Sequence, residues 1–192
     1  FSSRRRHTRL LTVTGVQTCA LPISVTEVVN LMLQTHRSKL NQIDFERISQ
    51  KQGFSVSNML TIASLVQAEG DQVDFQKISR VIRNRLKANM KLQLDTTVLY
   101  AMKTKGRIKV TEADLKVDSK YNTYQYLGLP PGPIGNPGTE SLLAALNPAE
   151  GDWLYFITVK PGDTRFTASY DEFLTWKELF NKNYSNGLFG KS

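Results

Sequence analysis

The residue best suited to chemistry in this sequence is Glu69, an acid at the end of a helix predicted over residues 58–69. Four apolar residues of this helix share one face by their spacing: Met59, Ile62, Ala63 and Val66. Glu69 continues that face, so we expect burial to raise the pKa of its carboxyl, and the negative end of the helix dipole to act in the same direction. A carboxylic acid that stays protonated near neutral pH can serve as a general acid. The alternative interpretation is an ordinary last-turn residue that points into solvent.

Other polar side chains could join Glu69, and each has a structural alternative. Asp95 could be a second carboxylate, or it could cap a helix that starts at Thr96. Three tyrosines stand close together in a predicted loop: Tyr121, Tyr124 and Tyr126. Their rings could form a wall that stacks on sugars, or they could pack at the edge of the core.

The remaining reactive residues exclude several classes of site. His36 is the single histidine outside residues 1–24, so triads that use histidine and histidine-rich metal sites lack their parts. Cys19 is the single cysteine, which excludes an internal disulfide framework and a cysteine-ligated zinc site. The sequence contains no phosphate-binding loop, HExxH motif or serine nucleophile elbow. We therefore expect no metal ion or other cofactor.

The composition is that of an ordinary globular domain. Of 192 residues, 40% are hydrophobic and 22% are charged, which excludes collagen-like, coiled-coil and wholly disordered chains. No run of eighteen apolar residues is present, so the sequence contains no predicted membrane span. The formal charge of +8 suggests an anionic partner such as nucleic acid or a cell-wall polymer.

Residues 1–24 need separate treatment. They contain no acid, the single cysteine and four arginines: Arg4, Arg5, Arg6 and Arg9. A basic arm that binds nucleic acid and a targeting segment are both conceivable, but VTGVQTCALPI resembles the translation of a sequencing adapter fused in frame. We therefore interpret residues 1–24 as a non-native, disordered segment. Without its arginines the net charge falls to +4, which identifies no partner.

The elements that must position Glu69 are mostly helical. Helices are predicted over residues 25–40, 44–52, 58–69, 96–103, 139–146 and 170–183, and two more start at Asp71 and Thr111. Ser24 or Thr26 is the expected cap of the first helix, and Ser57 that of the helix over 58–69. Residues 153–160 and 164–169 are predicted strands of a hairpin, and the Pro- and Gly-rich residues 118–138 a loop. The predicted fold class is therefore α+β, helix-dominated, with a small antiparallel sheet that includes a C-terminal β-hairpin.

Four ordered motifs carry a resemblance to a known family. They are TIASLVQAEG at 61–70, KLQLDTTVLYAM at 91–102, YNTY at 121–124 and GLPPGPIGNPG at 128–138, followed by LYFITVK and FTASYDEF. In order and spacing they resemble the YceG-like, or MltG, endolytic lytic transglycosylases. The similarity covers about residues 25–184, which we expect to form the catalytic domain, with residues 185–192 as a tail.

The resemblance implies cleavage of the β-1,4 bond after N-acetylmuramic acid in nascent peptidoglycan, with a 1,6-anhydro sugar as the new end. The catalytic glutamate of the family falls on Glu69. One acid/base suffices because the 6-hydroxyl of the sugar attacks the anomeric carbon, unlike in standard glycoside hydrolysis. Six further residues match motif positions and are expected to line the glycan groove or hold its loop: Gln93, Asp95, Tyr121, Asn122, Tyr124 and Asn136.

The resemblance also implies partners and a location. The expected partners are peptidoglycan glycan strands and cell-wall synthases, with no nucleic acid, at the extracytoplasmic face of the bacterial cell membrane. The resemblance implies that membrane attachment would come only from the family's N-terminal helix, and we expect this helix and a LysM-like subdomain to be missing from residues 1–192. Two alternatives stay open: a hydrolytic muramidase that uses Glu69 with Asp95, and a non-catalytic module that binds the wall or nucleic acid through its basic surface.

Overall fold

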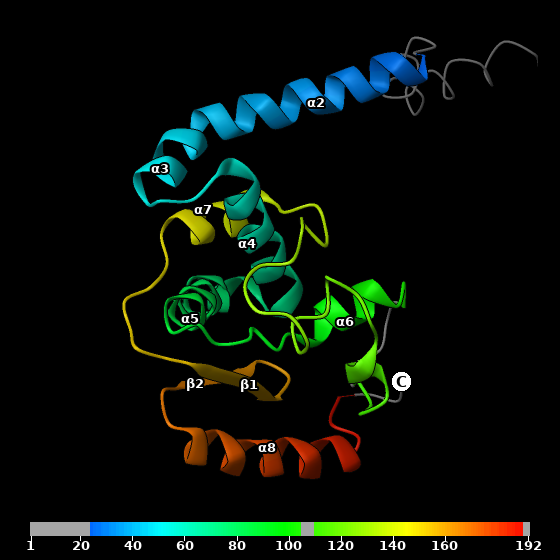
Figure 1. Cartoon of the computed structure of the whole chain (residues 1–192), viewed down its shortest axis with the longest axis vertical. Coiled ribbons are helices and arrows are strands. Elements are labelled where there is room, and N and C mark those ends of the chain that lie inside the picture. Colours follow the sequence, from blue (N-terminus) through cyan, green and yellow to red (C-terminus); the bar gives the residue numbers. More distant parts are fainter. Residues whose placement is uncertain (1–23, 105–109, 190–192) are drawn as a thin grey trace, which may run out of the picture. The chain divides into compact units, whose positions relative to one another are not determined.

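The elements around Glu69 were located in a computed structural model that describes residues 24–104 and 110–189. The predicted non-native segment 1–24 lies outside the described residues, except for Ser24. The chain divides into two units, Phe1–Gln42 and Ile43–Ser192. The described helices and strands are α2 (Val25–Gln42), α3 (Phe45–Lys51), α4 (Val56–Glu69), η1 (Gln72–Asp74), α5 (Phe75–Lys87), α6 (Asp95–Ala101), η2 (Asp114–Lys116), α7 (Thr139–Leu146), β1 (Tyr155–Lys160), β2 (Asp163–Thr167) and α8 (Tyr170–Ser185) (Figure 1).

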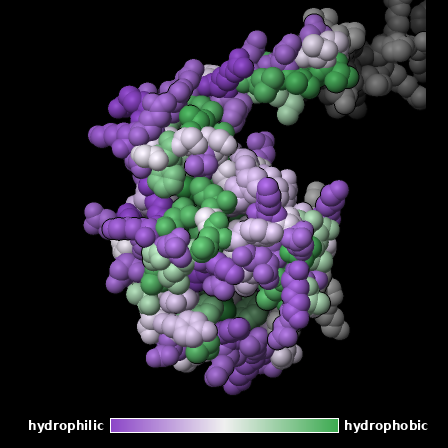
Figure 2. All heavy atoms as spheres, in the orientation of Figure 1, coloured by the Kyte–Doolittle hydropathy of each residue, from purple (hydrophilic) through white to green (hydrophobic). Residues whose placement is uncertain are grey.

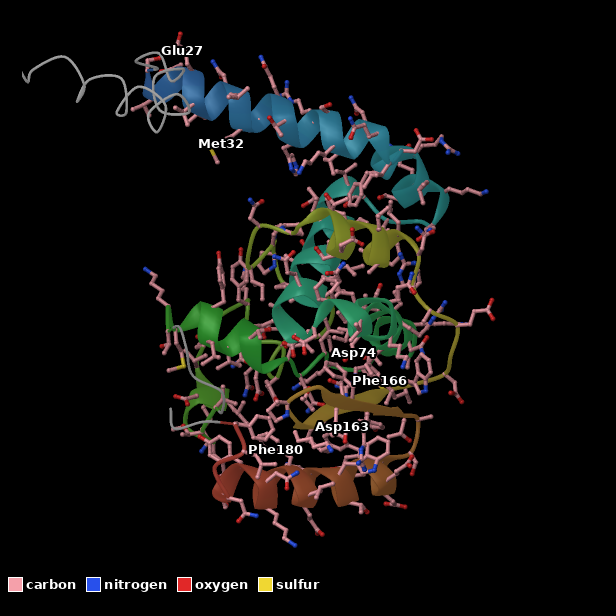
Figure 3. The ribbon with its side chains drawn as sticks, turned by 180° about the vertical axis from the view of Figure 1, so that it is seen from behind. Glu27, Met32, Asp74, Asp163, Phe166 and Phe180 are labelled. Atoms are coloured by element: carbon pink, nitrogen blue, oxygen red, sulfur yellow. The ribbon has the colours of Figure 1, made fainter. Side chains whose placement is uncertain are left out.

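The described part of the first unit is the helix α2. The Ser24 hydroxyl accepts a hydrogen bond from the Glu27 amide at 3.2 Å, and the Glu27 carboxylate accepts one from the Ser24 amide at 2.7 Å. This reciprocal capping box confirms Ser24 as the cap of the predicted helix. Apolar side chains such as Val25 and Met32 are exposed on α2 (Figures 2 and 3). Across residues 24–104 and 110–189, no helix has the combined length and hydrophobicity that a bilayer crossing requires.

The core of the second unit is built around α4. This helix packs against α3, α5, α6 and α7 (Figure 1). The largest fully buried side chains of α4 and α5 are Met59, Ile62, Leu65, Val66, Ile78, Val81 and Ile82. The predicted apolar face of α4 is therefore confirmed as its buried face. The helix starts earlier than predicted because Ser55, not Ser57, accepts the capping hydrogen bond from the Asn58 amide at 3.1 Å.

The C-terminal part confirms the predicted hairpin and the α+β fold class. Strand β1 pairs antiparallel with β2, with Phe156 opposite Phe166. Gly162 in the turn has φ +77°, a left-handed conformation that glycine adopts without strain. Helix α8 packs on β1, where the rings of Tyr155 and Phe173 stack at 5.3 Å between centroids, and aromatic side chains fill the layer between hairpin and helix (Figure 3).

Three predicted helices differ in the structure. The helix expected from Asp71 begins with the short 3₁₀ turn η1, and the α-helix starts at Phe75. The helix expected from Thr111 is only the 3₁₀ turn η2, although Thr111 and Asp114 exchange side-chain hydrogen bonds with each other's amides as in a capping box. The helix expected over 96–103 is α6, which ends at Ala101 before Lys103 takes a left-handed φ of 56°. Residues 118–138 contain no helix or strand, as predicted.

Candidate functional site

Glu69 is the last residue of α4, at the end of its buried face. Gly70 follows with an extended backbone, φ −169°, so the chain leaves the helix directly after the acid. The Glu69 side chain is half-buried and contacts the start of α6, where the Thr96 hydroxyl donates a hydrogen bond to Glu69 Oε1. The structure therefore contradicts the alternative of a residue that points freely into solvent.

The surroundings of Glu69 confirm the predicted rise in pKa. Burial raises the pKa of the Glu69 carboxyl from its ordinary 4.5 to about 7, and the negative charge of Asp95 adds to the rise. The hydroxyl and main-chain amide of Thr96 act against this rise because they donate hydrogen bonds to the carboxylate. Glu69 therefore holds its proton close to neutral pH. A group with such a pKa can donate a proton as a general acid and can then accept one as a general base.

Asp95 is the first residue of α6, and Tyr124 holds its carboxylate. The Tyr124 hydroxyl donates to Asp95 Oδ1 at 2.5 Å. Burial raises the pKa of Asp95, while the bond from Tyr124 and the positive charge of Lys177 on α8 act in the opposite direction. The expectation that Asp95 caps this helix is wrong: Leu94 occupies the cap position, since the Asp95 carboxylate faces Tyr124 instead.

Arg85 on α5 holds the segment that leads into α6. Its guanidinium is almost completely buried, and it donates to the main-chain oxygens of Leu154, Lys91 and Leu92 at 2.6–3.0 Å. It also donates to Gln93 Oε1 at 3.2 Å. Gln93 is exposed and has a left-handed φ of 52°. Arg85 was not predicted as a site residue because no local pattern marks an arginine that binds main-chain carbonyl groups.

The YNTY turn lies against the start of α6. Thr123 Oγ1 accepts from the Leu94 amide and lies 2.9 Å from Thr97 Oγ1, so both threonines join the turn to α6. Asn122 is fully buried, and its Nδ2 donates to the main-chain oxygens of Leu115 and Val117, while its Oδ1 accepts from the Tyr124 amide. Every polar atom of the Asn122 side chain is thus used to hold the loop that presents Tyr124 to Asp95.

The proline-rich loop is fastened to α4 by two residues that sequence analysis missed. Ser64 Oγ accepts from the Ile134 amide at 3.1 Å. Gln67 donates to the main-chain oxygen of Asn136 at 3.3 Å and accepts from the Gly138 amide at 2.5 Å. The helix that ends in Glu69 therefore also sets the position of this loop.

The structure brings some predicted site residues together and separates others. Asp95 and Tyr124 join Glu69 in one cluster, and Gln93 is linked to it through Arg85 and the chain. Tyr121 packs on Tyr100, with 4.8 Å between ring centroids, and Asn136 is exposed on the proline-rich loop. In the part of the chain that the structure describes, no group of three His, Cys, Asp or Glu side chains could hold a metal ion.

Comparisons with known proteins show which family this chain resembles. The model of the YceG-like family matches residues 20–178. A curated relative from Bacillus subtilis, named endolytic murein transglycosylase, is 40% identical over 158 residues, which is 82% of this chain and 43% of that protein. A protein of the same name from Streptococcus pneumoniae is 39% identical over 108 residues, 54% of this chain and 20% of that protein.

A solved structure of a similar protein has the same fold. The crystal structure of a YceG-like protein from Listeria monocytogenes superposes with a TM-score of 0.72 at 36% identity, and the match covers 81% of this chain and 50% of that chain. This chain spans half or less of the length of each of these relatives. Because the family model covers more than half of the sequence, the chain belongs to the YceG-like family.

Proposed function

We propose that this chain is the catalytic part of an endolytic lytic transglycosylase that cleaves the glycan strands of peptidoglycan, with Glu69 as its single acid/base. The observation that carries the proposal is the half-buried Glu69, whose pKa is raised to about 7 and whose carboxyl lies beside Thr96 and Asp95. The names of the relatives, endolytic murein transglycosylase, support the same activity.

The proposed reaction needs one carboxyl group in two protonation states. Protonated Glu69 gives its proton to the glycosidic oxygen as the bond between that oxygen and C1 of N-acetylmuramic acid breaks. The Glu69 carboxylate then takes the proton of the 6-hydroxyl of the same sugar as O6 bonds to C1. The products are a free 4-hydroxyl and a 1,6-anhydro end, and Glu69 is protonated again. Because no water attacks, no second catalytic carboxylate is required.

The neighbouring residues receive supporting roles in this proposal. Asp95, held by Tyr124, keeps a negative charge near Glu69 and so favours the protonated acid. Gln93, Tyr121 and Asn136 are proposed to contact the glycan, since part or all of each side chain is accessible to solvent. For Asn122 the role that its contacts support is to hold the loop rather than to bind sugar.

Further parts of the proposal rest on the family. We propose that residues 25–184 form the catalytic domain, that peptidoglycan is the substrate, and that the protein acts outside the cytoplasm at the bacterial cell membrane. Cell-wall synthases are its proposed protein partners. The name of the relatives, endolytic murein transglycosylase, supports the substrate class.

Glu69→Gln tests the proposal. The variant keeps the shape of the side chain and can still accept the hydrogen bond from Thr96, but it cannot transfer a proton. The full chain, Glu69→Gln and the matched control Glu150→Gln, an exposed acid in the loop before β1, are incubated with peptidoglycan, and the new ends are identified by mass spectrometry. We expect anhydro ends from the chain and the control and none from Glu69→Gln.

Other outcomes would contradict the proposal in distinct ways. Reducing ends, one water heavier than anhydro ends, would indicate a hydrolytic muramidase. Binding to peptidoglycan without cleavage would indicate a wall-binding module. Normal release of anhydro ends by Glu69→Gln would show that another residue is the acid.

A further inference from the structure

Thr96 is the side chain whose hydroxyl contacts the Glu69 carboxyl. It is the second residue of α6 and half-buried, and it donates to Glu69 Oε1. Its main-chain amide also donates to the carboxylate. Thr96 lies 27 positions from Glu69 in the sequence, so only the packing of α6 beside the end of α4 produces this contact.

We propose that Thr96 is a positioning residue for Glu69: its hydroxyl holds Oε1 and so leaves Oε2 as the oxygen that exchanges the proton with the substrate. The inference rests on the proposed function. Without such a contact, the side chain of a helix-terminal glutamate followed by glycine can sample many rotamers, and fixing it costs conformational entropy. A hydroxyl on a neighbouring helix removes that freedom before the substrate arrives.

Hydrogen bonds fix the start of α6, which carries Thr96, and the segment that precedes it. The Thr97 hydroxyl donates to the Leu94 oxygen at 2.6 Å and lies 2.9 Å from the Thr123 hydroxyl. Arg85 binds the main chain of residues 91 and 92 directly before α6. Thr96 is therefore carried by a helix start that is fixed from two sides, which a positioning residue requires.

The charges around Glu69 show why a hydroxyl donor matters in the second half of the reaction. The negative charge of Asp95 raises the pKa of Glu69, and the negative charge of Glu69 raises the pKa of Tyr124. Two cations act on the neighbours of Glu69: the charge of Arg85 lowers the pKa of Tyr124, and that of Lys177 lowers the pKa of Asp95. The donors of Thr96 therefore stabilise the Glu69 carboxylate that remains after proton transfer, where burial and Asp95 both disfavour it.

The experiment compares Thr96→Val with Thr96→Ser in the full chain. Valine keeps the shape but removes the hydroxyl, whereas serine keeps the hydroxyl. Thr175→Val is the matched control, because Thr175 is an exposed helical threonine of α8 whose hydroxyl donates to the Asp171 oxygen. The titration of the Glu69 side-chain carboxyl is followed by carbon NMR, which needs no turnover, and the pH profile of anhydro-end release is measured in parallel.

We expect Thr96→Val to raise the pKa of Glu69 by about one pH unit, because a hydrogen bond to the charged form is lost. The alkaline limb of the activity profile should move upward by the same amount, and kcat should fall about tenfold with KM unchanged. Thr96→Ser should restore the titration and the rate. Thr175→Val should leave both unchanged.

Two results would overturn the inference. The first is a folded Thr96→Val protein in which Glu69 titrates as in the parent chain. The second is a serine variant that fails to restore the titration, which would assign the effect to packing rather than to the hydroxyl. If Thr96→Val does not fold, Thr96→Ala is measured in its place with the same expected shift. Activity that survives in Glu69→Gln would overturn the proposed function instead, and the NMR titration separates the two cases.

Discussion

Replacing Glu69 by glutamine should change how the stability of the protein depends on pH. Burial raises the pKa of Glu69 from 4.5 to about 7 in the folded state, whereas in the unfolded chain the carboxyl has its ordinary pKa. Between these values the unfolded chain releases the proton first, so the folded state binds more protons and loses stability as the pH rises. Below a pH of about 4 the carboxyl is mostly protonated in both states, so it adds little to the pH dependence of stability.

The size of this effect follows from the two pKa values. The gap between 4.5 and about 7, at about 1.36 kcal/mol for each pH unit, corresponds to about 3 kcal/mol that the folded state loses when the pH has passed the folded pKa. The glutamine variant has no such titration. Its free energy of unfolding should therefore rise relative to the parent chain by about 3 kcal/mol between about pH 4 and about pH 9.

Urea unfolding at a series of pH values measures this difference. Carboxylates that do not interact with Glu69 titrate equally in both proteins, so their contributions cancel when the two free energies are subtracted. The control Glu150→Gln should show no growth of the difference with pH, since Glu150 is exposed. A constant difference between Glu69→Gln and the parent chain across the whole range would refute the reasoning that burial keeps Glu69 protonated.

Three further predictions concern the surroundings of Glu69. Asp95→Asn removes a negative charge that raises the pKa of Glu69, so the alkaline limb of the activity profile should move to lower pH, and an upward movement would contradict this assignment. Arg85→Met leaves three main-chain oxygens without their donor and should lower the free energy of unfolding by about 3 kcal/mol in urea titrations; an unchanged value would mean that water replaces the guanidinium. Gln67→Ala removes the acceptor of the Gly138 amide, and hydrogen exchange at that amide should become at least about tenfold faster, with the Leu92 amide as an internal reference.

The arrangement of the site explains why its motifs are spread along the chain. Helix α4 supplies the acid at its end and fastens the proline-rich loop through Ser64 and Gln67. Helix α6 supplies Thr96 and Asp95, and the YNTY turn supplies Tyr124. Two of these motifs thus contribute groups around the carboxyl that α4 supplies, so a change of Thr96 or Asp95 should alter the protonation of Glu69.

Local patterns in the sequence were sufficient for most of the helices, for the hairpin and for the long loop, whereas the helix expected from Thr111 is only a 3₁₀ turn. The spacing of apolar residues in α4 and the turn Pro161-Gly162-Asp163 act over a few residues, and the structure contains both elements. The same spacing placed Glu69 on the buried face and predicted its raised pKa. Helix starts were less certain: Ser55 rather than Ser57 caps α4, because neighbouring hydroxyls compete for the same amides.

Tertiary structure alone decided which groups meet Glu69. Thr96, Asp95 and Tyr124 come from segments that are 26 to 55 positions away, and no periodicity within one helix specifies a partner on another. Asp95 looked like a helix cap, but the fold offers it a tyrosine hydroxyl instead. Arg85 carries a charge that normally stays at the surface, but the segments that lead into β1 and α6 supply the carbonyl acceptors that permit its burial. Short-range spacing sets the face on which a side chain lies, whereas its hydrogen-bond partners depend on how distant elements pack.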